Sequence, residues 1–447
     1  MKISVAGAGY VGLVTGVCLA EMGHQVTCID IHKEKIELLQ TGKSPLYEPK
    51  LDPLLKKNLS EGRLTFTLDP ERAYSNPEII FIAVGTPEHP DGSANLEFIG
   101  EAAYTIATHI KNDVIICTKS TVPVGTNEKI KSILVSNILP TIKADVVSNS
   151  EFLREGSAIG DFFNPDRIII GGDDSNTTDM IEQIYLPLKV PIIKTDIRSA
   201  EMIKYASNAF LATKISFINE IAAICEKTGA NIDEVSNGIG LDQRIGRHFL
   251  QAGIGYGGSC FPKDTKALVQ LAGNHKHPFE LLKSVINVNN RQQSLPVKKA
   301  KEAIGTLMDK KVAVLGLSFK PNTDDVREAA SLTIISELFE EGAWITVYDP
   351  IAIPNVKKIF GNSIEYTEDI RLALNKADLA IIATEWGQIK DIPLQEFHFY
   401  MNDPIVIDGR NCFPLHEVEK HSITYISIGR PTVTNINKDH MISFENH

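Results

Sequence analysis

The feature that most constrains the fold of this chain is a glycine-rich turn that joins a strand to a helix near the N-terminus. Residues 3–6 read as a buried strand, the turn Gly7-x-Gly9-x-x-Gly12 opens a helical stretch, and the next strand ends at Asp30. Such glycines permit a tight turn and let backbone N–H groups approach a pyrophosphate at the helix N-terminus. Asp30 can accept hydrogen bonds from both ribose hydroxyls and would repel a 2′-phosphate, which predicts NAD rather than NADP as the ligand.

Further apolar runs extend this βαβ unit into a sheet. Residues 78–84, 114–117 and 167–170 have the continuous apolar character of buried strands, and helix-like segments separate them. This alternation predicts a doubly wound parallel sheet.

The N-terminal pattern returns in the second half of the chain. Residues 310–316 resemble the first strand and its glycine, residues 344–349 resemble the second strand and its terminal acid, and residues 377–383 resemble the strand at 78–84. We therefore expect a second Rossmann-like sheet, in which residues 316–321 replace the glycine fingerprint. This replacement predicts a nucleotide diphosphate site without a second dinucleotide.

Three cations of the C-terminal half fall at or just after predicted strand ends, where ligands bind in open α/β sheets. They are Lys320, Arg327 and Arg410. Each alone is an ordinary surface cation, but as a set at the mouth of one sheet they suit a diphosphate.

A stretch from Ser199 to Thr228 contains neither Gly nor Pro, and its apolar residues predict one long helix covered on several sides. Lys204 and Asn208 lie four residues apart and so share a face of it. The predicted fold class is α/β, with two Rossmann-like doubly wound parallel sheets joined by a long central helix. The expected parts are an NAD-binding domain at 1–196, a helical segment at 197–300, a nucleotide-sugar domain at 301–430 and a mobile tail at 431–447.

Composition excludes several classes of function. The formal net charge of −11 argues against sequence-independent binding to nucleic acid or to an anionic membrane. No apolar run is long enough to span a bilayer, and a strand pattern begins at once, so we expect a cytoplasmic protein. The six cysteines are widely spaced, which predicts neither disulfides nor a metal site.

One cysteine stands out from the other five. Cys260 follows the glycines at 255, 257 and 258, with Lys263 and Asp264 just after it. An average free cysteine is buried and inert, whereas a thiol beside a nicotinamide can hold an aldehyde as a thiohemiacetal that is oxidised to a thioester. Glu151 and Glu155 share the spacing of Lys204 and Asn208, and a surface ion pair of Glu155 with Arg154 remains open.

Several motifs, in this order, resemble the bacterial UDP-glucose 6-dehydrogenases of the UDP-glucose/GDP-mannose dehydrogenase family, from Met1 to about Arg410. After the glycine turn they are Val84-Gly85-Thr86-Pro87, Ser120-Thr121-Val122-Pro123, Glu151-Phe152-Leu153-x-Glu155-Gly156, Lys204-x-x-x-Asn208, Gly257-Gly258-Ser259-Cys260-Phe261-Pro262-Lys263-Asp264 and Phe319-Lys320-Pro321-Asn322-Thr323-Asp324-Asp325-Val326-Arg327.

The resemblance implies two-step oxidation of UDP-glucose to UDP-glucuronate with two NAD and one water. Cys260 would be the nucleophile, while Lys204 would stabilise the oxyanion with a hydrogen bond from Asn208. Asp264 would handle protons with Lys204, and Glu151 with Thr121 would activate the hydrolytic water.

The resemblance also implies two sets of binding residues. NAD would contact Gly7, Gly9, Tyr10, Val11, Gly12, Asp30, Lys35, Thr86, Thr121, Glu155, Lys263 and Arg327. The nucleotide sugar would contact Glu151, Phe152, Leu153, Glu155, Lys204, Asn208, Arg244, Phe249, Leu250, Gln251, Ala252, Gly253, Tyr256, Gly257, Lys320 and Arg410. Arg244 resembles a residue that reaches the neighbouring subunit's site, which implies a homodimer built around the long helix.

The chain departs from the family pattern at three positions. Ser150 stands where a Pro is usual before Glu151, Asn95 stands where an Asp is common, and Ala330 replaces a usual Pro. Loss of the proline frees the backbone before Glu151 and puts its geometry in doubt.

Other functions remain open on the sequence. GDP-mannose or a UDP-N-acetylhexosamine are alternative substrates, although Phe261 favours UDP-glucose because the mannose enzymes tend to carry Leu there. A one-step hydroxyacid dehydrogenase would explain residues 1 to about 230 but leaves the second sheet and Cys260 without a role. A non-catalytic nucleotide sensor is the third reading.

Overall fold

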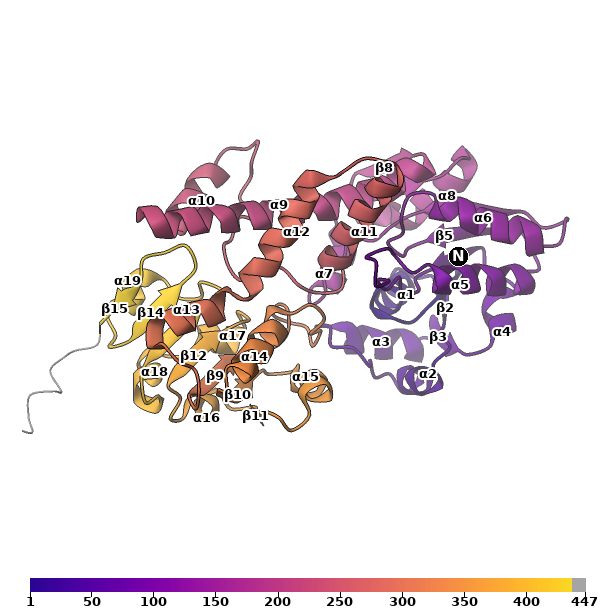
Figure 1. Ribbon diagram of the computed structural model, residues 1–447. Coiled ribbons are helices and arrows are strands. Elements are labelled where there is room, and N and C mark those ends of the chain that lie inside the picture. Colours follow the sequence, from indigo (N-terminus) through magenta and orange to yellow (C-terminus); the bar gives the residue numbers. More distant parts are fainter. Residues whose placement is uncertain (436–447) are drawn as a thin grey trace, which may run out of the picture. The chain divides into compact units, whose positions relative to one another are not determined.

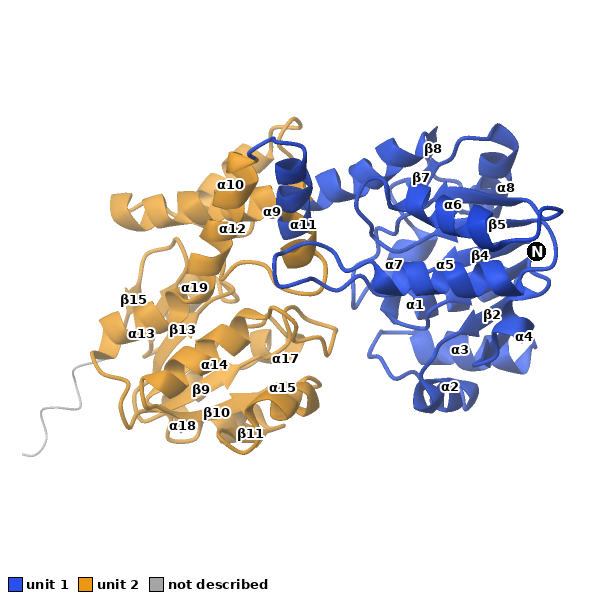
Figure 2. Ribbon diagram, turned by 45° about the vertical axis from the view of Figure 1, so that its right-hand side comes forward, with its two compact units in different colours: residues 1–208, 266–278 blue, residues 209–265, 279–447 orange. Residues whose placement is uncertain are grey.

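The computed structural model describes residues 1–435, and Figure 1 labels its elements. The chain forms two compact units: residues 1–208 with 266–278, and residues 209–265 with the chain from Phe279 onward (Figure 2). Helices α9 (Ile197–Thr228) and α11 (Phe261–Asn274) each contribute residues to both units. Among the described residues, no helix is both long enough and apolar enough to cross a membrane. The predicted domain boundaries stay a prediction.

The first unit is built on an eight-stranded sheet of order β3-β2-β1-β4-β5-β6-β7-β8. Its strands are β1 (Lys2–Ala6), β2 (Gln25–Ile29), β3 (Leu64–Thr67), β4 (Ile79–Ile82), β5 (Val114–Thr118), β6 (Ala144–Ser148), β7 (Ile168–Gly171) and β8 (Ile192–Thr195). The helical elements between them are α1 (Tyr10–Glu21), α2 (Lys33–Gln40), α3 (Leu51–Ser60), α4 (Pro70–Tyr74), α5 (Glu97–His109), α6 (Thr126–Asn137), α7 (Ala158–Phe163), α8 (Ser175–Tyr185) and η1 (Leu186–Leu188).

Both faces of this sheet are buried, because successive side chains of a strand point to opposite sides. Val5 packs in a core with residues of α1, α3 and α7, while its neighbour Ala6 packs with residues of α5 and α6. All strand pairs are parallel except β6 with β7. The strand order reverses between β1 and β4, which places a ligand crevice at the carboxyl ends of these two strands.

The second unit contains a seven-stranded sheet of order β11-β10-β9-β12-β13-β14-β15. Its strands are β9 (Lys311–Leu315), β10 (Trp344–Tyr348), β11 (Glu365–Thr367), β12 (Leu379–Ile382), β13 (Ile405–Asp408), β14 (Thr424–Ser427) and β15 (Val433–Thr434). Helices of this unit are α10 (Ile232–Gly240), α12 (Glu280–Gln293), α13 (Leu295–Ile304), α14 (Ala330–Glu340), α15 (Ile353–Phe360), α16 (Ile370–Leu374), α17 (Gly387–Lys390), α18 (Gln395–Tyr400) and α19 (Leu415–Val418).

This sheet repeats the logic of the first. Val314 packs with residues of α13 and α14, and its neighbour Leu315 packs with residues of α16 and α18. The strand order reverses between β9 and β12, so the second crevice lies at their carboxyl ends. Only β15 runs antiparallel among the described strands of this sheet.

The predicted α/β class with two doubly wound sheets and a long helix is confirmed. The helix predicted from Ser199 to Thr228 begins two residues earlier, at Ile197. Within the expected tail at 431–447, Val433–Thr434 forms β15, and residues 436–447 lie outside the described residues.

Candidate active site

The glycine turn of the first unit combines two structural glycines with one that leaves space. Gly7 has φ +96°, and a Cβ there would lie 2.7 Å from the Ala83 carbonyl oxygen. A Cβ on Gly12 would lie 2.0 Å from the Gly7 oxygen, whereas a Cβ on Gly9 would meet nothing within 4 Å. Gly9 is also the N-cap of α1 and provides no side-chain cap, so the N–H groups of the first turn point toward the open space. This arrangement fits a pyrophosphate.

Asp30 closes the same crevice. Its carboxylate accepts hydrogen bonds from Ala8 N at 2.9 Å, from His32 N at 3.0 Å and from Lys35 Nζ at 2.8 Å. Burial opposes ionisation of Asp30, but the hydrogen bonds from Lys35, His32 and Ala8 outweigh it and lower the pKa to about 2. The group is therefore a carboxylate at neutral pH, as ribose recognition requires. The NAD predicted from the turn and Asp30 fits these residues.

Tyr10 of the turn is tied to a distant segment. Its hydroxyl donates to the carboxylate of Glu48, and Gly156 N donates to both the Tyr10 hydroxyl (2.9 Å) and Glu48 Oε2 (2.6 Å). Burial, followed by the bond to Glu48, raises the pKa of Tyr10 well above its usual range. The structure thus fastens the end of the segment that starts at Glu151 to helix α1.

The loops after β4 and β5 also meet, since Thr86 Oγ1 donates to the Thr121 carbonyl at 3.0 Å. Both threonines are buried. Two residues predicted from separate motifs therefore lie at one edge of the sheet.

A buried ion pair joins the Glu151 segment to α9. Lys204 Nζ lies 3.3 Å from Glu151 Oε1, and each side chain is only 4% exposed. Glu151 Oε2 accepts from Leu153 N at 2.5 Å, and Lys204 Nζ lies 5.0 Å from the centre of the Phe152 ring. Asn208, one turn further along α9, is buried as well. An acid and a base buried together are the kind of pair that proton transfer uses.

Sequence reasoning missed a second buried lysine beside this pair. Lys119 directly follows the last residue of β5. Its Nζ donates to Asn149 Oδ1 at 3.0 Å and to the Tyr185 hydroxyl at 3.3 Å. Burial lowers the pKa of Lys119 to about 8. The position of Lys119 directly after a buried strand could have identified it from the sequence. The buried Glu48 could not have been identified in this way, because its partners come together only in the fold. The hydroxyl of Ser150, which replaces the usual proline, is buried and finds no partner within the described part of the chain.

Cys260 lies in the second unit, on a loop that its glycines hold close to the rest of that unit. A Cβ on Gly257 would lie 2.2 Å from the Glu328 carbonyl oxygen, and one on Gly258 (φ +81°) would lie 2.7 Å from the Phe319 ring. Gly258 N donates to the Arg327 carbonyl at 2.9 Å. Side chains larger than hydrogen would therefore push the loop away from its support.

The thiol itself is partly exposed and immediately precedes helix α11, where Asp264 N donates to the Cys260 carbonyl at 2.9 Å. A helix N-terminus stabilises a thiolate, which is the nucleophilic form. Lys263 Nζ and the buried Asp264 Oδ1 form an ion pair at 2.5 Å in the first turn of this helix.

The segment before the loop is held by amide side chains. Asn219 Oδ1 accepts from Gly253 N at 2.9 Å, and Gln292 Nε2 donates to the Gly253 carbonyl at 2.8 Å. Asn289 bonds both main-chain groups of Tyr256, at 2.8 and 3.0 Å. Within the predicted substrate segment, Leu250 and Ala252 are buried, Gln251 is exposed, and the Phe249 ring lies 6.2 Å from that of Phe261.

The predicted cations of the second unit differ in their surroundings. Arg327 pairs with Asp325 at 2.7 Å, and Arg244 pairs with Asp242 at 2.6 Å with 89% of its side chain exposed. Lys320 Nζ lies 5.4 Å from the Phe319 ring centre. Arg410 is largely buried: it donates to main-chain carbonyls, and its Nε lies 3.4 Å from Glu385 Oε2.

The structure thus brings Glu151, Phe152 and Lys204 together in one unit and Cys260, Lys263 and Asp264 in the other. The approach of Lys204 to Cys260 stays a prediction. No group of three or more metal-ligating side chains occurs within residues 1–435.

Two Rossmann-like sheets, an NAD-type glycine turn and a thiol at a helix N-terminus define an NAD-dependent oxidoreductase. Three family models, described as the NAD binding, central and UDP binding domains of the UDP-glucose/GDP-mannose dehydrogenase family, match residues 1–189, 198–291 and 313–414. The chain belongs to this family.

Individual relatives agree with the family models. The chain is 54% identical over 433 residues to UDP-glucose 6-dehydrogenase YwqF of Bacillus subtilis, covering 97% of this chain and 98% of the relative. It is 46% identical to UDP-glucose 6-dehydrogenase of Rhizobium meliloti, covering 96% and 100%. A solved UDP-glucose dehydrogenase from Pyrobaculum islandicum is similar, with TM-score 0.90, 38% identity and coverage of 96% and 98%.

Proposed function

We propose that this chain oxidises the C6 alcohol of UDP-glucose to the carboxylate of UDP-glucuronate through a thioester on Cys260. The observation that carries the proposal is the placement of Cys260, a partly exposed thiol at the start of α11 on a loop packed against the second unit. The NAD-type turn of the first unit and the match of residues 313–414 to a UDP binding domain support it. A one-step hydroxyacid dehydrogenase accounts for neither the UDP binding match nor Cys260, and a nucleotide sensor leaves Cys260 without a role.

The chemistry proceeds in four stages: oxidation of the alcohol, addition of the thiolate, oxidation of the adduct, and hydrolysis. The alcohol loses a hydride from C6 and a proton from its oxygen, and NAD, when bound, accepts the hydride of each oxidation. The Cys260 thiolate forms a C–S bond to the aldehyde carbon, and the oxygen takes up a proton to give a thiohemiacetal. This loses a second hydride, to a second NAD, and a proton, leaving a thioester. Water adds to the thioester carbon, the C–S bond breaks, and the carboxylate and the Cys260 thiolate are released together with two protons.

The buried pair in the first unit is assigned to oxygen and proton chemistry. Lys204 stabilises negative charge on the reacting oxygen, with a hydrogen bond from Asn208, and Asp264 shares proton handling with Lys204. Glu151 and Thr121 activate the hydrolytic water. The 3.3 Å separation of Lys204 Nζ and Glu151 Oε1 supports these roles, because each charge stabilises the charged form of the other group between steps.

The test of the two-step mechanism is to count NADH. Wild type should form two NADH for each UDP-glucose consumed, and a yield of one contradicts the proposal. Cys260→Ala should lose acid formation, and Cys260→Ser should accumulate a covalent ester that mass spectrometry detects, since an ester of serine hydrolyses slowly here. Cys225→Ala, which alters a buried cysteine of the same unit, is the matched control.

The choice of UDP-glucose among nucleotide sugars rests on the relatives. Those named UDP-glucose 6-dehydrogenase are 54% to 42% identical, whereas a solved UDP-D-ManNAc dehydrogenase from Pyrococcus horikoshii is 27% identical. Parallel assays with UDP-glucose, GDP-mannose and a UDP-N-acetylhexosamine decide the matter. Higher kcat/KM for either of the last two overturns the choice.

We also propose a homodimer. Phe210, Phe217 and Ile224 recur every seven residues on α9 and are 65%, 53% and 54% exposed, a stripe that a second copy would cover. Phe217→Glu should give monomers by analytical ultracentrifugation. The control Leu139→Glu alters an exposed apolar residue just after α6 and should leave the dimer intact. The cytoplasm is the proposed location, since all six cysteines are free thiols.

A further inference from the structure

Arg410 joins three loops of the second unit. Its Nε donates to the Ala383 carbonyl at 2.9 Å, Nη1 to the Gly255 carbonyl at 3.0 Å and Nη2 to the Phe319 carbonyl at 3.3 Å. These carbonyls belong to the loop after β12, the glycine loop that leads to Cys260, and the loop after β9 that carries Lys320. One guanidinium therefore holds together the segments that border the crevice of the second sheet.

The main chain of Arg410 is fixed from behind by Asp408, the last residue of β13. Asp408 Oδ1 accepts from Arg410 N at 2.8 Å, and Oδ2 accepts from Cys412 N at 2.7 Å and from the Tyr425 hydroxyl at 2.6 Å. Asn411, at φ +54°, completes the turn, and its side chain makes two 2.9 Å bonds to the main chain of Ile428. The turn that presents Arg410 thus depends on a buried carboxylate.

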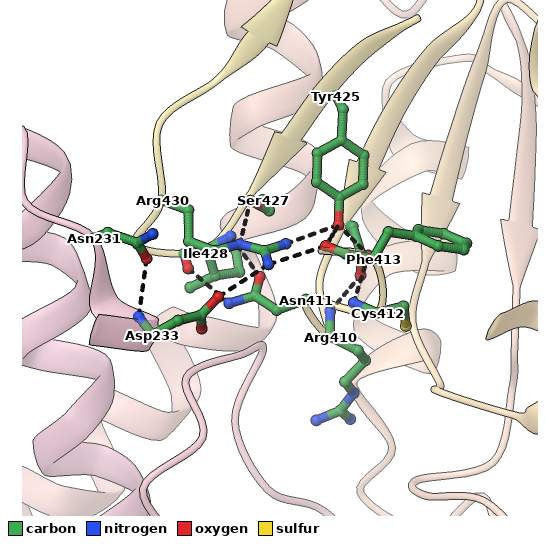
Figure 3. A network of polar contacts seen from close by, with 11 residues as sticks. Asn231, Asp233, Arg410, Asn411, Cys412, Phe413, Tyr425, Ser427, Ile428 and Arg430 are labelled. Carbon is green, nitrogen blue, oxygen red and sulfur yellow. Dashed lines mark hydrogen bonds and ion pairs between the residues drawn. The ribbon is translucent and has the colours of Figure 1, made fainter. Parts of the chain in front are cut away.

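A second buried arginine balances this carboxylate. Arg430, whose side chain is 2% exposed, donates from Nη2 to the Tyr425 hydroxyl at 2.8 Å and from Nε to Ser427 Oγ at 2.9 Å. Its Nη1 donates to the Phe413 carbonyl and to Asp233 Oδ2, both at 3.1 Å (Figure 3). The Tyr425 hydroxyl consequently receives a bond from Arg430 and gives one to Asp408, so it links the two buried charges.

Such a network is costly to bury unless every member is satisfied, and replacing it with apolar side chains would often be neutral for stability. Burial raises the pKa of Asp408, while the bonds from Tyr425 and from the Arg410 N–H oppose this. Every contact of Asp408 leads either to the Arg410 turn or to Tyr425. The network is directed at one turn of the main chain and not at the core in general.

We infer that Asp408, Tyr425 and Arg430 are positioning residues that set Arg410, and through it the Cys260 and Lys320 loops, for the nucleoside diphosphate of the substrate. This rests on the proposed function. None of the three needs to touch the substrate. Without the Tyr425 hydroxyl the carboxylate loses the 2.6 Å bond that ties it to β14, the turn relaxes, and Arg410 no longer holds three carbonyls at once.

The test compares two tyrosines of the same sheet. Tyr425→Phe removes the linking hydroxyl, while Tyr366→Phe removes a hydroxyl that donates to the Gly361 carbonyl at 2.9 Å in another loop. UDP serves as the probe in titration calorimetry with the full chain, alongside KM for UDP-glucose, KM for NAD and the melting temperature. Tyr425→Phe should lower the affinity for UDP five- to tenfold and raise KM for UDP-glucose by a similar factor. KM for NAD should stay within twofold, and Tyr366→Phe should leave UDP binding unchanged.

A purely structural role predicts a different pattern. A lower melting temperature for Tyr425→Phe with unchanged UDP affinity overturns the inference while leaving the proposed function intact. A wild-type chain that binds no UDP overturns both. If Tyr425→Phe does not fold, Arg430→Lys takes its place. This change keeps the positive charge but removes the branched guanidinium, and it should give a smaller loss of UDP affinity. The double variant Tyr425→Phe/Arg410→Lys should be no weaker than Arg410→Lys alone, and additive losses contradict action through Arg410.

Discussion

The two sheets begin with the same strand, turn, helix and strand, yet only one turn is built to receive a dinucleotide. Gly7 (φ +96°) and Gly316 (φ +91°) have the same backbone conformation, and a Cβ on either would collide with the chain after the neighbouring strand, at Ala83 or at Thr384. The shape of the turn is therefore common to both. What differs is the third residue of the turn, which is Gly9 in the first and Ser318 in the second.

The acids after the second strands differ as well. Asp30 is 8% exposed and binds Ala8 N beside the open space over Gly9. Asp349 is 0% exposed, and its carboxylate accepts from Leu317 N, Ser318 N, Ile351 N, Ala352 N and the indole N–H of Trp386. The same acid in the same place has become a structural group in the second sheet. A shared fold thus carries two binding chemistries because a few side chains decide whether the acid faces a ligand.

The largest expected effect tests the third turn residue. Gly9→Val fills the space over the turn, and since Gly9 has φ −72° the chain can accept it, so NAD affinity should fall at least about a hundredfold, or ~3 kcal/mol, with little loss of stability. Ser318→Val, at the matching position, should do the opposite and destabilise the second unit with NAD affinity unchanged. NAD titration and thermal unfolding measure the two. Equal effects on NAD would erase the distinction between the turns.

The next test exchanges charge for a neutral amide. Asp349→Asn places an NH2 group among five N–H donors and should destabilise the second unit by about 3 kcal/mol. Trp344 and Trp386 are the only tryptophans of the sequence, and both lie in that unit, so tryptophan fluorescence during urea unfolding follows it alone. Asp30→Asn should leave the urea midpoint of this fluorescence transition unchanged. It should lower the affinity for NAD and reduce the preference for NAD over NADP.

The pH dependence of the first unit follows from Asp30. Its folded pKa of about 2 lies below the usual 3.8, so its contribution, about 2 kcal/mol, is present above pH 4 and is lost as the pH falls toward 2. Urea unfolding followed by far-UV circular dichroism at several pH values should show this loss in wild type. A curve for Asp30→Asn that is equally steep between pH 4 and pH 2 would contradict the assignment.

The smallest effect concerns the indole that covers Asp349. Trp386→Phe removes one donor of five and should cost about 1 kcal/mol, followed through the remaining Trp344. UDP affinity should change less than twofold. A gain of dinucleotide binding at the second sheet in this variant would show that the indole, and not the turn, excludes the ligand.

Much of this comparison is visible in the sequence because it depends on local pattern. The strands, the two turns, Asp30 and the length of α9 follow from apolar periodicity and glycine spacing. The roles of buried polar groups do not, since Lys119, Glu48 and Arg430 acquire their partners from segments far away in the chain. Arg410 illustrates the limit: its place after a strand predicted a diphosphate ligand, but its bonds to three carbonyls required the fold.

The state of the six thiols has a practical consequence. Cys18, Cys28, Cys117 and Cys225 are buried, and burial raises the pKa of Cys412 well above its usual range, so these five resist alkylation and oxidation at neutral pH. Cys260 alone combines exposure with a helix N-terminus. A mild electrophile should therefore label the native protein at one site without any engineering, and peroxide stress should inactivate it at that same sulfur before it damages the fold.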